Sequence, residues 1–470
     1  MSAKLTFKEK LGFSLGDAAS NLFWQTFSMF LMYFYTDIFG ITAAAAGTMF
    51  LVVRFFDFAN DPIMGVLADR TKTRWGKFRP YLLYLAVPFG VIGILTFTTP
   101  DFSESGKLVY AYVTYSLMMV VYTAINIPYS ALMGVLSADP LERTKAASYR
   151  FVAAFAGGLV VQATALKLVK VLGGDNEALG WQLSMSVFAF LAAVLFISTF
   201  AMTKERVRPP KSQVSSLKAD LRNLVTNIPW LVLVLVGIFL LTFVTIRNGS
   251  IMYYFKYYVG EQSFSILGRE FNLSTDGLAS TFMVLGTGAN LVGVLITGYI
   301  SKLFGKKRAF VGLMFLTIFL SAAFMVLSPE AVLVMFALQV LISLIMGPMS
   351  PILWSMYTDI ADYSEWKNGR RATGLVMSAS TMAQKFGWTI GGAVLGWMLA
   401  YFGYEEKNAL DPTAVVVQSA ETIKGIRYLI SIIPAGMAIL TFLGMLIYKL
   451  DEKTMYTIKE DLEKRREEED

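Results

Sequence analysis

The chain has 470 residues, of which 55% are hydrophobic and only 16% are charged, and its mean hydropathy is +0.55. A soluble protein carries roughly 25% charged residues, so this composition predicts a membrane protein with many spans. The absence of Cys and His excludes disulfides, thiol catalysis, histidine proton relays and metal sites with Cys or His ligands. The net charge of +7 is typical of basic cytoplasmic loops and does not indicate nucleic-acid binding.

The apolar segments are long enough to cross a hydrocarbon layer about 30 Å thick. The first is too long for a signal peptide and has no small-residue cleavage site, so we expect it to stay in the membrane. The pattern predicts an all-α membrane protein with twelve spans, at residues 11–37, 44–68, 80–99, 108–136, 146–171, 182–203, 229–259, 277–301, 308–327, 331–357, 373–402 and 426–449.

The loops alternate in charge. Those after even-numbered spans are rich in Lys and Arg, whereas those after odd-numbered spans are acidic or neutral. The positive-inside rule then places both termini in the cytoplasm, and we expect a plasma-membrane protein, in a bacterium one of the inner membrane. The tail 450–470 is charged throughout and is expected to be a solvated cytoplasmic helix.

A polar linker, 204–228, separates two predicted six-span bundles, 1–203 and 229–449. Residues 32–35 (Met-Tyr-Phe-Tyr) recur as 252–255 (Met-Tyr-Tyr-Phe), an offset of 252 − 32 = 220 residues. Pro128 and Ser130 recur as Pro348 and Ser350 at the same offset. Two parallel repeats joined by a cytoplasmic linker are typical of the major facilitator architecture, in which the halves rock about a central cavity.

The second span carries three charges near its middle. Arg54, Asp57 and Asp61 are three and four residues apart, so they share one face of a helix. Each ionised side chain near a bilayer centre costs about 2.5–3.5 kcal/mol on insertion scales, so three of them on one helix face indicate a specific role. Two carboxylates against one Arg suit Na⁺, Li⁺ or H⁺, and hard cations prefer several oxygens. We therefore predict a site for a monovalent cation only, formed by Asp57, Asp61, Asn60 and, from the fourth span, Thr123. The alternative is a buried packing pair of Arg54 and Asp57.

Further polar residues lie inside other predicted spans. Exposing any of these side chains to lipid is energetically unfavourable, so we expect them to converge on a central cavity. Carboxylate, amide and guanidinium groups beside aromatic rings suit a ligand with many hydroxyls. The predicted substrate-binding residues are Asp17, Tyr122, Asn126, Tyr129, Arg150, Trp354, Thr381, Gln384 and Lys385. Lys385 and Arg54 are also candidates for coupling, with Lys385 as counter-ion of the carboxylates when the cation is absent. Alternatively, Arg150 snorkels to the interface and Trp354 only packs between helices.

The cytoplasmic loops of the two halves carry opposite charges. Ion pairs between them would hold an inner gate shut, and because one exposed pair contributes under about 1 kcal/mol, such a gate needs a network. Alternatively these charges only set the topology. The predicted gate residues are Asp69, Arg70, Arg74, Lys77, Arg79, Arg143, Asp359, Asp362, Glu365, Arg370 and Arg371.

From the first span to the eleventh, these motifs resemble the glycoside–pentoside–hexuronide:cation symporters, the group of the melibiose permease. The resemblance is carried by Gly16-Asp17, Arg54 with Asp57 and Asn60-Asp61-Pro62, Arg74-Trp75-Gly76-Lys77-Phe78-Arg79-Pro80, Asn126-Ile127-Pro128-Tyr129, Asp359, Asp362-Tyr363, Glu365-Trp366 and Lys385. It implies a secondary symporter with Asp57, Asp61 and Thr123 as cation ligands. It also implies sugar-binding or coupling roles for Asp17, Arg150, Thr381 and Lys385.

Two positions depart from the melibiose permease. Asn126 stands where that protein has an Asp, and Ser130 stands where it has a Trp. In that protein these positions touch the sugar and shape the cation site, so neither melibiose nor Na⁺ follows from the resemblance. The Asn-Ile-Pro-Tyr form looks more like the xyloside- and glucuronide-type members.

We therefore expect cation-coupled symport of a sugar, glycoside, pentoside or uronate by a monomer, with no cofactor other than the coupling ion. One alternative is a lysolipid-type transporter of the same fold. Another is a non-transporting membrane sugar sensor, which would more naturally carry a sizeable cytoplasmic domain. A membrane enzyme would need a nucleophile–base pair or a metal cluster, and the sequence offers neither.

Overall fold

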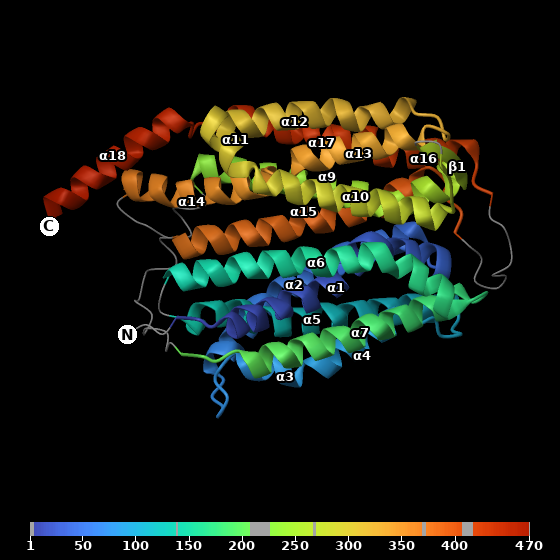
Figure 1. The fold of residues 1–470 in the computed structure, drawn as a ribbon, viewed down its shortest axis with the longest axis horizontal. Helices are drawn as coiled ribbons and strands as arrows, with labels where there is room; N and C mark the ends of the chain where they lie inside the picture. The colour runs from blue at the N-terminus through green and yellow to red at the C-terminus, as the bar shows by residue number, and fades with distance from the viewer. Residues whose placement is uncertain are drawn as a thin grey trace. The chain divides into compact units, whose positions relative to one another are not determined.

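The structure, a computed structural model, describes residues 4–137, 140–206, 226–266, 269–368, 373–406 and 417–469. The chain forms two compact units. Unit 1 comprises Met1–Lys211, Ala279–Val284 and Leu399–Ser419, and unit 2 comprises Ser212–Leu278, Leu285–Met398 and Ala420–Asp470. Both consist mainly of long helices (Figure 1).

In the N-terminal half a helix begins one to six residues before the start of each of the six predicted spans. Its elements are α1 (Phe7–Tyr33), the π-helix η1 (Phe34–Phe39), α2 (Ala43–Arg70), α3 (Arg79–Tyr84), α4 (Ala86–Thr96), α5 (Glu104–Leu136), α6 (Pro140–Gly173) and α7 (Glu177–Met202). The start of α1 is a capping box, in which the Thr6 side chain accepts from the Glu9 amide and the Glu9 carboxylate accepts from the Thr6 amide.

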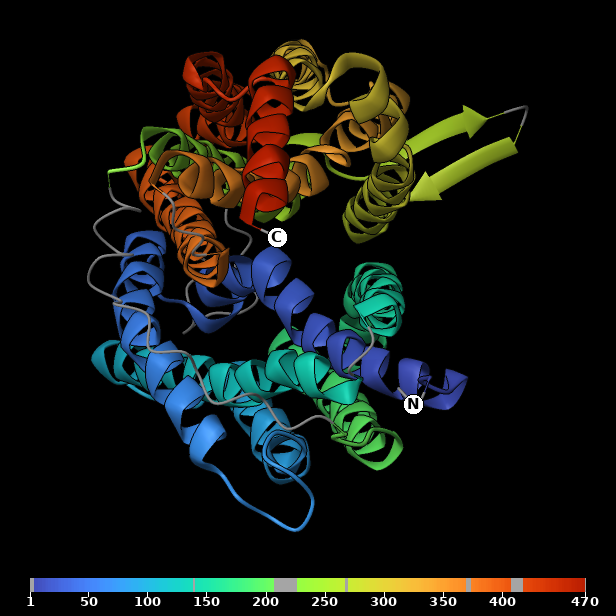
Figure 2. The ribbon, with the colours of Figure 1, turned by 90° about the vertical axis from the view of Figure 1, so that its left-hand side faces the viewer.

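The C-terminal half again begins with a long helix followed by a π-helix, and it has an inserted hairpin. Its elements are α9 (Ile228–Tyr253), the π-helix η2 (Tyr254–Val259), β1 (Gln262–Ile266), β2 (Arg269–Leu273), α10 (Thr275–Leu295), α11 (Thr297–Phe304), α12 (Lys306–Ala323), the 3₁₀-helix η3 (Phe324–Val326), α13 (Val332–Met346), α14 (Met349–Asn368), α15 (Thr373–Tyr401), α16 (Ala420–Ile430), α17 (Ile432–Ile447) and α18 (Glu452–Glu469). The insertion is the antiparallel hairpin β1–β2, which extends away from the helices (Figure 2). The sequence analysis did not predict it.

Each predicted span coincides with one helix or with consecutive helical segments. In the part of the chain that the structure describes, eight helices are long and apolar enough to cross a membrane. Two shorter apolar helices, Ala43–Arg54 and Ala86–Thr96, fall within the second and third predicted spans. The protein is a multi-pass membrane protein, and the number of twelve crossings stays a prediction.

The internal repeat has a structural counterpart. The π-helices η1 and η2 begin at Phe34 and Tyr254, an offset of 254 − 34 = 220 residues. Each is followed by a glycine with a positive φ, Gly40 with φ 81° and Gly260 with φ 72°. The repeated Met-Tyr motif therefore marks the same irregular helix end in both halves.

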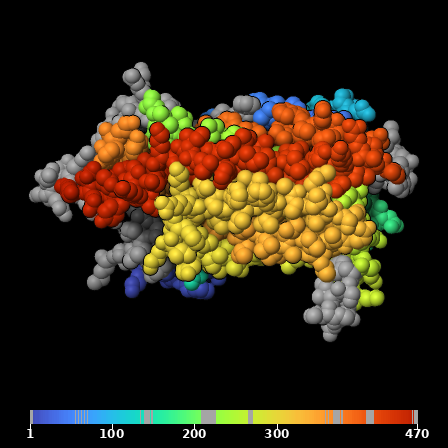
Figure 3. All heavy atoms as spheres, turned by 90° about the horizontal axis from the view of Figure 1, so that it is seen from above, coloured from blue at the N-terminus to red at the C-terminus, as the bar shows by residue number. Residues whose placement is uncertain are grey.

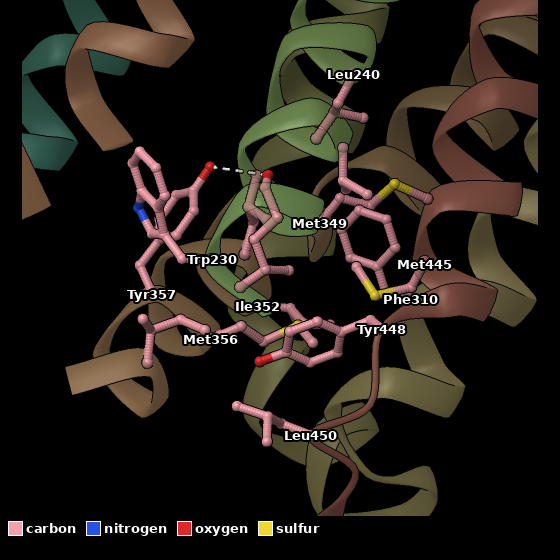
Figure 4. Packing of buried hydrophobic residues seen from close by; sticks show 14 of the residues in the cluster. Trp230, Leu240, Phe310, Met349, Ile352, Met356, Tyr357, Met445, Tyr448 and Leu450 are labelled. Atoms are coloured by element: carbon pink, nitrogen blue, oxygen red, sulfur yellow. Dashed lines mark hydrogen bonds between the residues drawn. The ribbon is translucent and has the colours of Figure 1, made fainter. Parts of the chain in front are cut away.

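The core of unit 2 lies between α9, α12, α14 and α17 (Figure 4). Tyr357 is fully buried there, and its hydroxyl donates to the Leu233 carbonyl at 3.3 Å. Helices α12, α13 and the C-terminal helices form one continuous face (Figure 3). Helices α12 and α17 carry exposed apolar side chains such as Phe319 and Leu443, as expected of helices in contact with lipid.

The C-terminal helix α18 is not solvated on all sides, which corrects the expectation for 450–470. Met455, Ile458 and Leu462 form an apolar stripe at helical spacing that packs on the core of unit 2. In addition, the Trp366 indole donates to Asp461 Oδ2 at 2.9 Å.

Candidate functional site

The predicted cation residues meet between α2 and α5. Arg54 Nη1 lies 2.7 Å from Asp57 Oδ2, and both side chains are buried, at 9% and 3% exposed. The Thr123 hydroxyl lies 2.9 Å from Asp57 Oδ1 and 3.2 Å from Asp61 Oδ1, so it can donate to either carboxylate. The fourth span thus supplies a neutral oxygen to the charged face of the second.

The chemistry of this group suits a monovalent cation. Arg54, Asp57 and Asp61 together carry a net formal charge of −1, which one monovalent cation would neutralise. The oxygens of two carboxylates and one hydroxyl are ligands of the type that hard cations prefer. Beside them, Asn60 Nδ2 is buried and has no hydrogen-bond partner among the described residues.

Asp17 on α1 and Arg150 on α6 form a bidentate ion pair. Arg150 Nε donates to Asp17 Oδ2 at 2.9 Å, and Nη2 donates to Oδ1 at 3.2 Å. The guanidinium also lies 5.1 Å above the Tyr129 ring, whose hydroxyl donates to the Phe13 carbonyl at 2.8 Å. Here the guanidinium is held inside unit 1 by Asp17, which favours the site interpretation of Arg150 over an interfacial anchor.

Asn126 is held by its neighbours. The Ser20 hydroxyl donates to Asn126 Oδ1 at 2.8 Å, and Asn126 Nδ2 donates to the Tyr122 carbonyl at 3.0 Å. The Tyr122 ring packs against Trp24 with centroids 5.9 Å apart. Asp17, Ser20 and Trp24 are three and four residues apart, so one face of α1 meets α5 and α6. Ser20 was missed from the sequence, where its small polar side chain beside Asp17 was the available signal.

The remaining predicted substrate residues belong to unit 2. Trp354 on α14 is half-buried and packs edge-on against Tyr357, with centroids 5.8 Å apart. On α15, Gln384 and Lys385 are half-buried, whereas Thr381 is exposed. That these side chains share one cavity with those of unit 1 stays a prediction.

The predicted inner gate is only partly described. Asp359 forms an ion pair with Lys306 at 2.7 Å, and both residues belong to unit 2 rather than to opposite halves. Asp362 and Glu365 are half-buried on α14. The Arg74 guanidinium stacks on the Trp75 ring at 4.4 Å. Arg370 and Arg371 and the side chains of Asp69, Arg70 and Arg143 lie outside the described residues, and the gate network stays a prediction.

The sequence analysis missed a carboxylate that organises the loop between α2 and α3. Glu205 accepts hydrogen bonds from the amides of Lys77, Phe78 and Arg79 at 2.9, 2.7 and 3.0 Å. Gly76 has φ 113°, and a Cβ there would lie 2.4 Å from Glu205 Oε1, so only glycine fits.

Unit 2 repeats the arrangement. Glu452 accepts from the Lys307 amide at 3.2 Å, and a Cβ on Gly305, whose φ is 80°, would lie 2.4 Å from Glu452 Oε1. The backbone amides of Lys77 and Arg79 thus stabilise the loop between α2 and α3, apart from any role of their side chains in the gate. The signal was an acidic residue shortly after the last helix of each repeat.

Arg247 was also missed, although it interrupts an apolar run. It is 4% exposed on α9, and its Nη1 donates to the Ile430 carbonyl at 2.8 Å. Pro434, four residues after Ile430, has no N–H to bond that carbonyl, so Arg247 supplies the missing donor. Its Nη2 donates to Gln339 Oε1 at 2.8 Å. Arg247 is therefore a structural residue of unit 2.

Comparison with known proteins decides the family. Residues 12–452 match the family described as MFS/sugar transport protein. The chain belongs to this family. It is accordingly a sugar transporter of the major facilitator type and not an enzyme, which confirms the predicted fold class and the resemblance to sugar symporters.

Two curated relatives cover nearly the whole transporter. The inner membrane symporter YicJ of Escherichia coli K12 is 38% identical over 462 residues, covering 98% of this chain and 96% of its own. The isoprimeverose transporter of Lactiplantibacillus pentosus is 35% identical over 453 residues, covering 95% of this chain and 89% of its own. Among solved structures, a D-xylose–proton symporter is similar in fold, with a TM-score of 0.63, 16% identity and coverage of 95% and 98% of the two chains.

Proposed function

We propose that this transporter carries out cation-coupled symport of a sugar, glycoside, pentoside or uronate by alternating access, with Na⁺, H⁺ or Li⁺ as coupling ion. The observation that carries the proposal lies on α5. Thr123 bonds the carboxylates of the cation group, and Asn126, three residues later, bonds Ser20 of α1 beside Asp17. One turn of α5 therefore joins the cation group to the residues beside Asp17, so that binding of the cation can change the affinity for the sugar, and the reverse.

The charges suggest how the ion drives the cycle. Without a cation, the Arg54–Asp57–Asp61 group is negative, and desolvating an uncompensated charge is expensive in the membrane. A bound cation neutralises the group, so that the N-terminal half can move while its cation site is closed to water. We assign Lys385 as the counter-charge that permits the empty carrier to return.

The substrate group is proposed at Asp17 and Arg150. A carboxylate and a guanidinium can each form paired hydrogen bonds with adjacent hydroxyls, and the Tyr129 and Tyr122 rings supply flat faces for a sugar ring. This polarity favours a hydroxyl-rich ligand over the acyl chain of a lysolipid. Similarity to an isoprimeverose transporter makes isoprimeverose the first candidate substrate.

The similarity to an inner membrane symporter supports a place in a bacterial inner membrane, with both termini cytoplasmic as the loop charges predict. We propose that the monomer is the functional unit, divided into the bundles 1–203 and 229–449. The linker 204–228 and the tail 450–470 would then face the cytoplasm.

A thermal-shift screen of the purified protein tests the proposal. Pentosides, hexosides and uronates are each added with Na⁺, with Li⁺ or at lowered pH. We expect a stabilising sugar whose effect grows when the coupling ion is present. The change Asp61→Asn should abolish the ion effect, whereas Asp175→Asn, an exposed loop carboxylate, should leave it intact. Equal sugar effects with and without every ion would contradict coupling.

A further inference from the structure

Helix α15 is divided between the two units. Its outer end belongs to unit 1, whereas the rest of the helix belongs to unit 2. Helix α15 runs from Thr373 to Tyr401, yet Leu399–Ser419 forms part of unit 1. After the helix, the chain turns at Gly403, whose φ of 69° favours glycine, and the Tyr404 amide donates to the Leu399 carbonyl at 3.0 Å. The described residues directly after α15, 402–406, thus belong to the same unit as the N-terminal helices.

Tyr404 makes the first bond between this segment and the N-terminal helices. Its hydroxyl donates to Asp37 Oδ2 at 2.6 Å. Asp37 is 2% exposed and Tyr404 is 4% exposed, and Asp37 lies in η1 at the end of the first predicted span. The Thr36 hydroxyl lies 2.9 Å from the same oxygen. A short hydrogen bond to a carboxylate is stronger than one between neutral groups.

Glu406 makes the second bond. Its Oε1 accepts from the Ala43 amide at 2.8 Å, and Ala43 is the first residue of α2. The free amides at a helix start favour a negative charge. Thr42 accepts from a different amide, that of Ala45, so the two side chains complement each other.

We propose that Tyr404 and Glu406 form a latch that holds the outer end of α15 on unit 1 and releases once in each transport cycle. The predicted topology places the η1–α2 loop and the chain after α15 on the outer side. Both bonds join polar groups that water can also bond, so hydrogen bonds to water can replace each of them when the outer side opens. The latch rests on the proposed alternating access, and neither of its two residues belongs to the cation group or the sugar group.

Hydrogen–deuterium exchange of the full-length protein in lipid nanodiscs tests the latch. Tyr404→Phe removes the donor and keeps the ring, and we expect exchange in peptides covering residues 36–46 and 399–406 to rise about tenfold. Tyr401→Phe is the matched control, because Tyr401 lies at the same helix end and is 77% exposed. Exchange in Tyr404→Phe equal to that in Tyr401→Phe would overturn the role of Tyr404.

A second pair of variants keeps the test independent of the tyrosine. Glu406→Ala should speed exchange of the Ala43 amide, whereas Glu405→Ala, at an exposed neighbour, should not. If neither latch variant differs from its control, there is no latch. These measurements need no sugar. Failure to find any transported sugar would therefore reject the proposed function without changing the exchange result, and unchanged exchange would reject the latch without touching sugar binding.

Discussion

Replacing Thr123 by Val tests whether the fourth span contributes to the cation site. The two side chains have nearly the same shape, so the change removes the hydroxyl and little else. Thr123 Oγ1 lies within hydrogen-bond distance of Asp57 and of Asp61, at 2.9 and 3.2 Å, but it carries one proton and donates to one of them at a time. In the bound state the Thr123 oxygen would face the cation, and a contact between a neutral polar group and a charged one contributes about 1.5–3 kcal/mol, so losing this ligand should lower cation affinity roughly 10- to 100-fold.

The assay is the half-saturating cation concentration for sugar uptake into proteoliposomes. Thr123→Ser, which keeps the hydroxyl, should stay close to wild type, and thermal unfolding without cation controls for a general loss of stability. A half-saturating concentration in Thr123→Val equal to that in Thr123→Ser would refute the assignment of Thr123 as a ligand.

Three further predictions concern sugar binding, the unit 2 fold and pH. Arg150→Lys keeps the charge but not the paired geometry with Asp17, so sugar affinity should drop about 10-fold or more in a binding assay, and unchanged affinity would make the pair structural. Arg247→Met leaves the buried Ile430 carbonyl without a donor and should destabilise unit 2 by about 1–3 kcal/mol. The loss should be much smaller in a Pro434→Ala background, because residue 434 then has an N–H that can bond this carbonyl. Melting shifts of the two changes that simply add would contradict this pairing. Burial raises the pKa of Glu9, but the hydrogen bonds from Thr6 and the nearby Arg206 outweigh burial and bring this pKa below the usual 4.5. The ionised Glu9 carboxylate therefore stabilises the folded protein above pH 4.5, and this contribution fades as the pH falls further. Glu9→Gln should therefore melt earlier than wild type at pH 7 and no earlier at strongly acidic pH, and an equal difference at both would argue against the linkage.

The sequence predicted those features that depend on spacing along one helix. The three- and four-residue intervals from Arg54 to Asp61 place the charges on one face of α2, and the structure shows that face meeting Thr123. The 220-residue repeat was visible because both halves keep the same aromatic residues at an irregular helix end.

Contacts between helices were harder to predict, because they depend on how each helix is rotated about its own axis. Periodicity does not determine that rotation. The bond from Ser20 to Asn126 and the pairing of Arg247 with the carbonyl freed by Pro434 both join distant segments. The apolar stripe of α18 was overlooked because abundant charges on its other faces dominate the composition.

The most direct test of the central claim is cation-driven accumulation of sugar by Asp61→Asn in proteoliposomes, measured beside equilibrium sugar binding by the same variant. The claim is that this carboxylate neutralises the coupling ion while Asp17 and Arg150 hold the sugar. We expect sugar binding to persist and uphill accumulation to be lost. Accumulation at the wild-type level would contradict the cation site and, with it, the coupling mechanism.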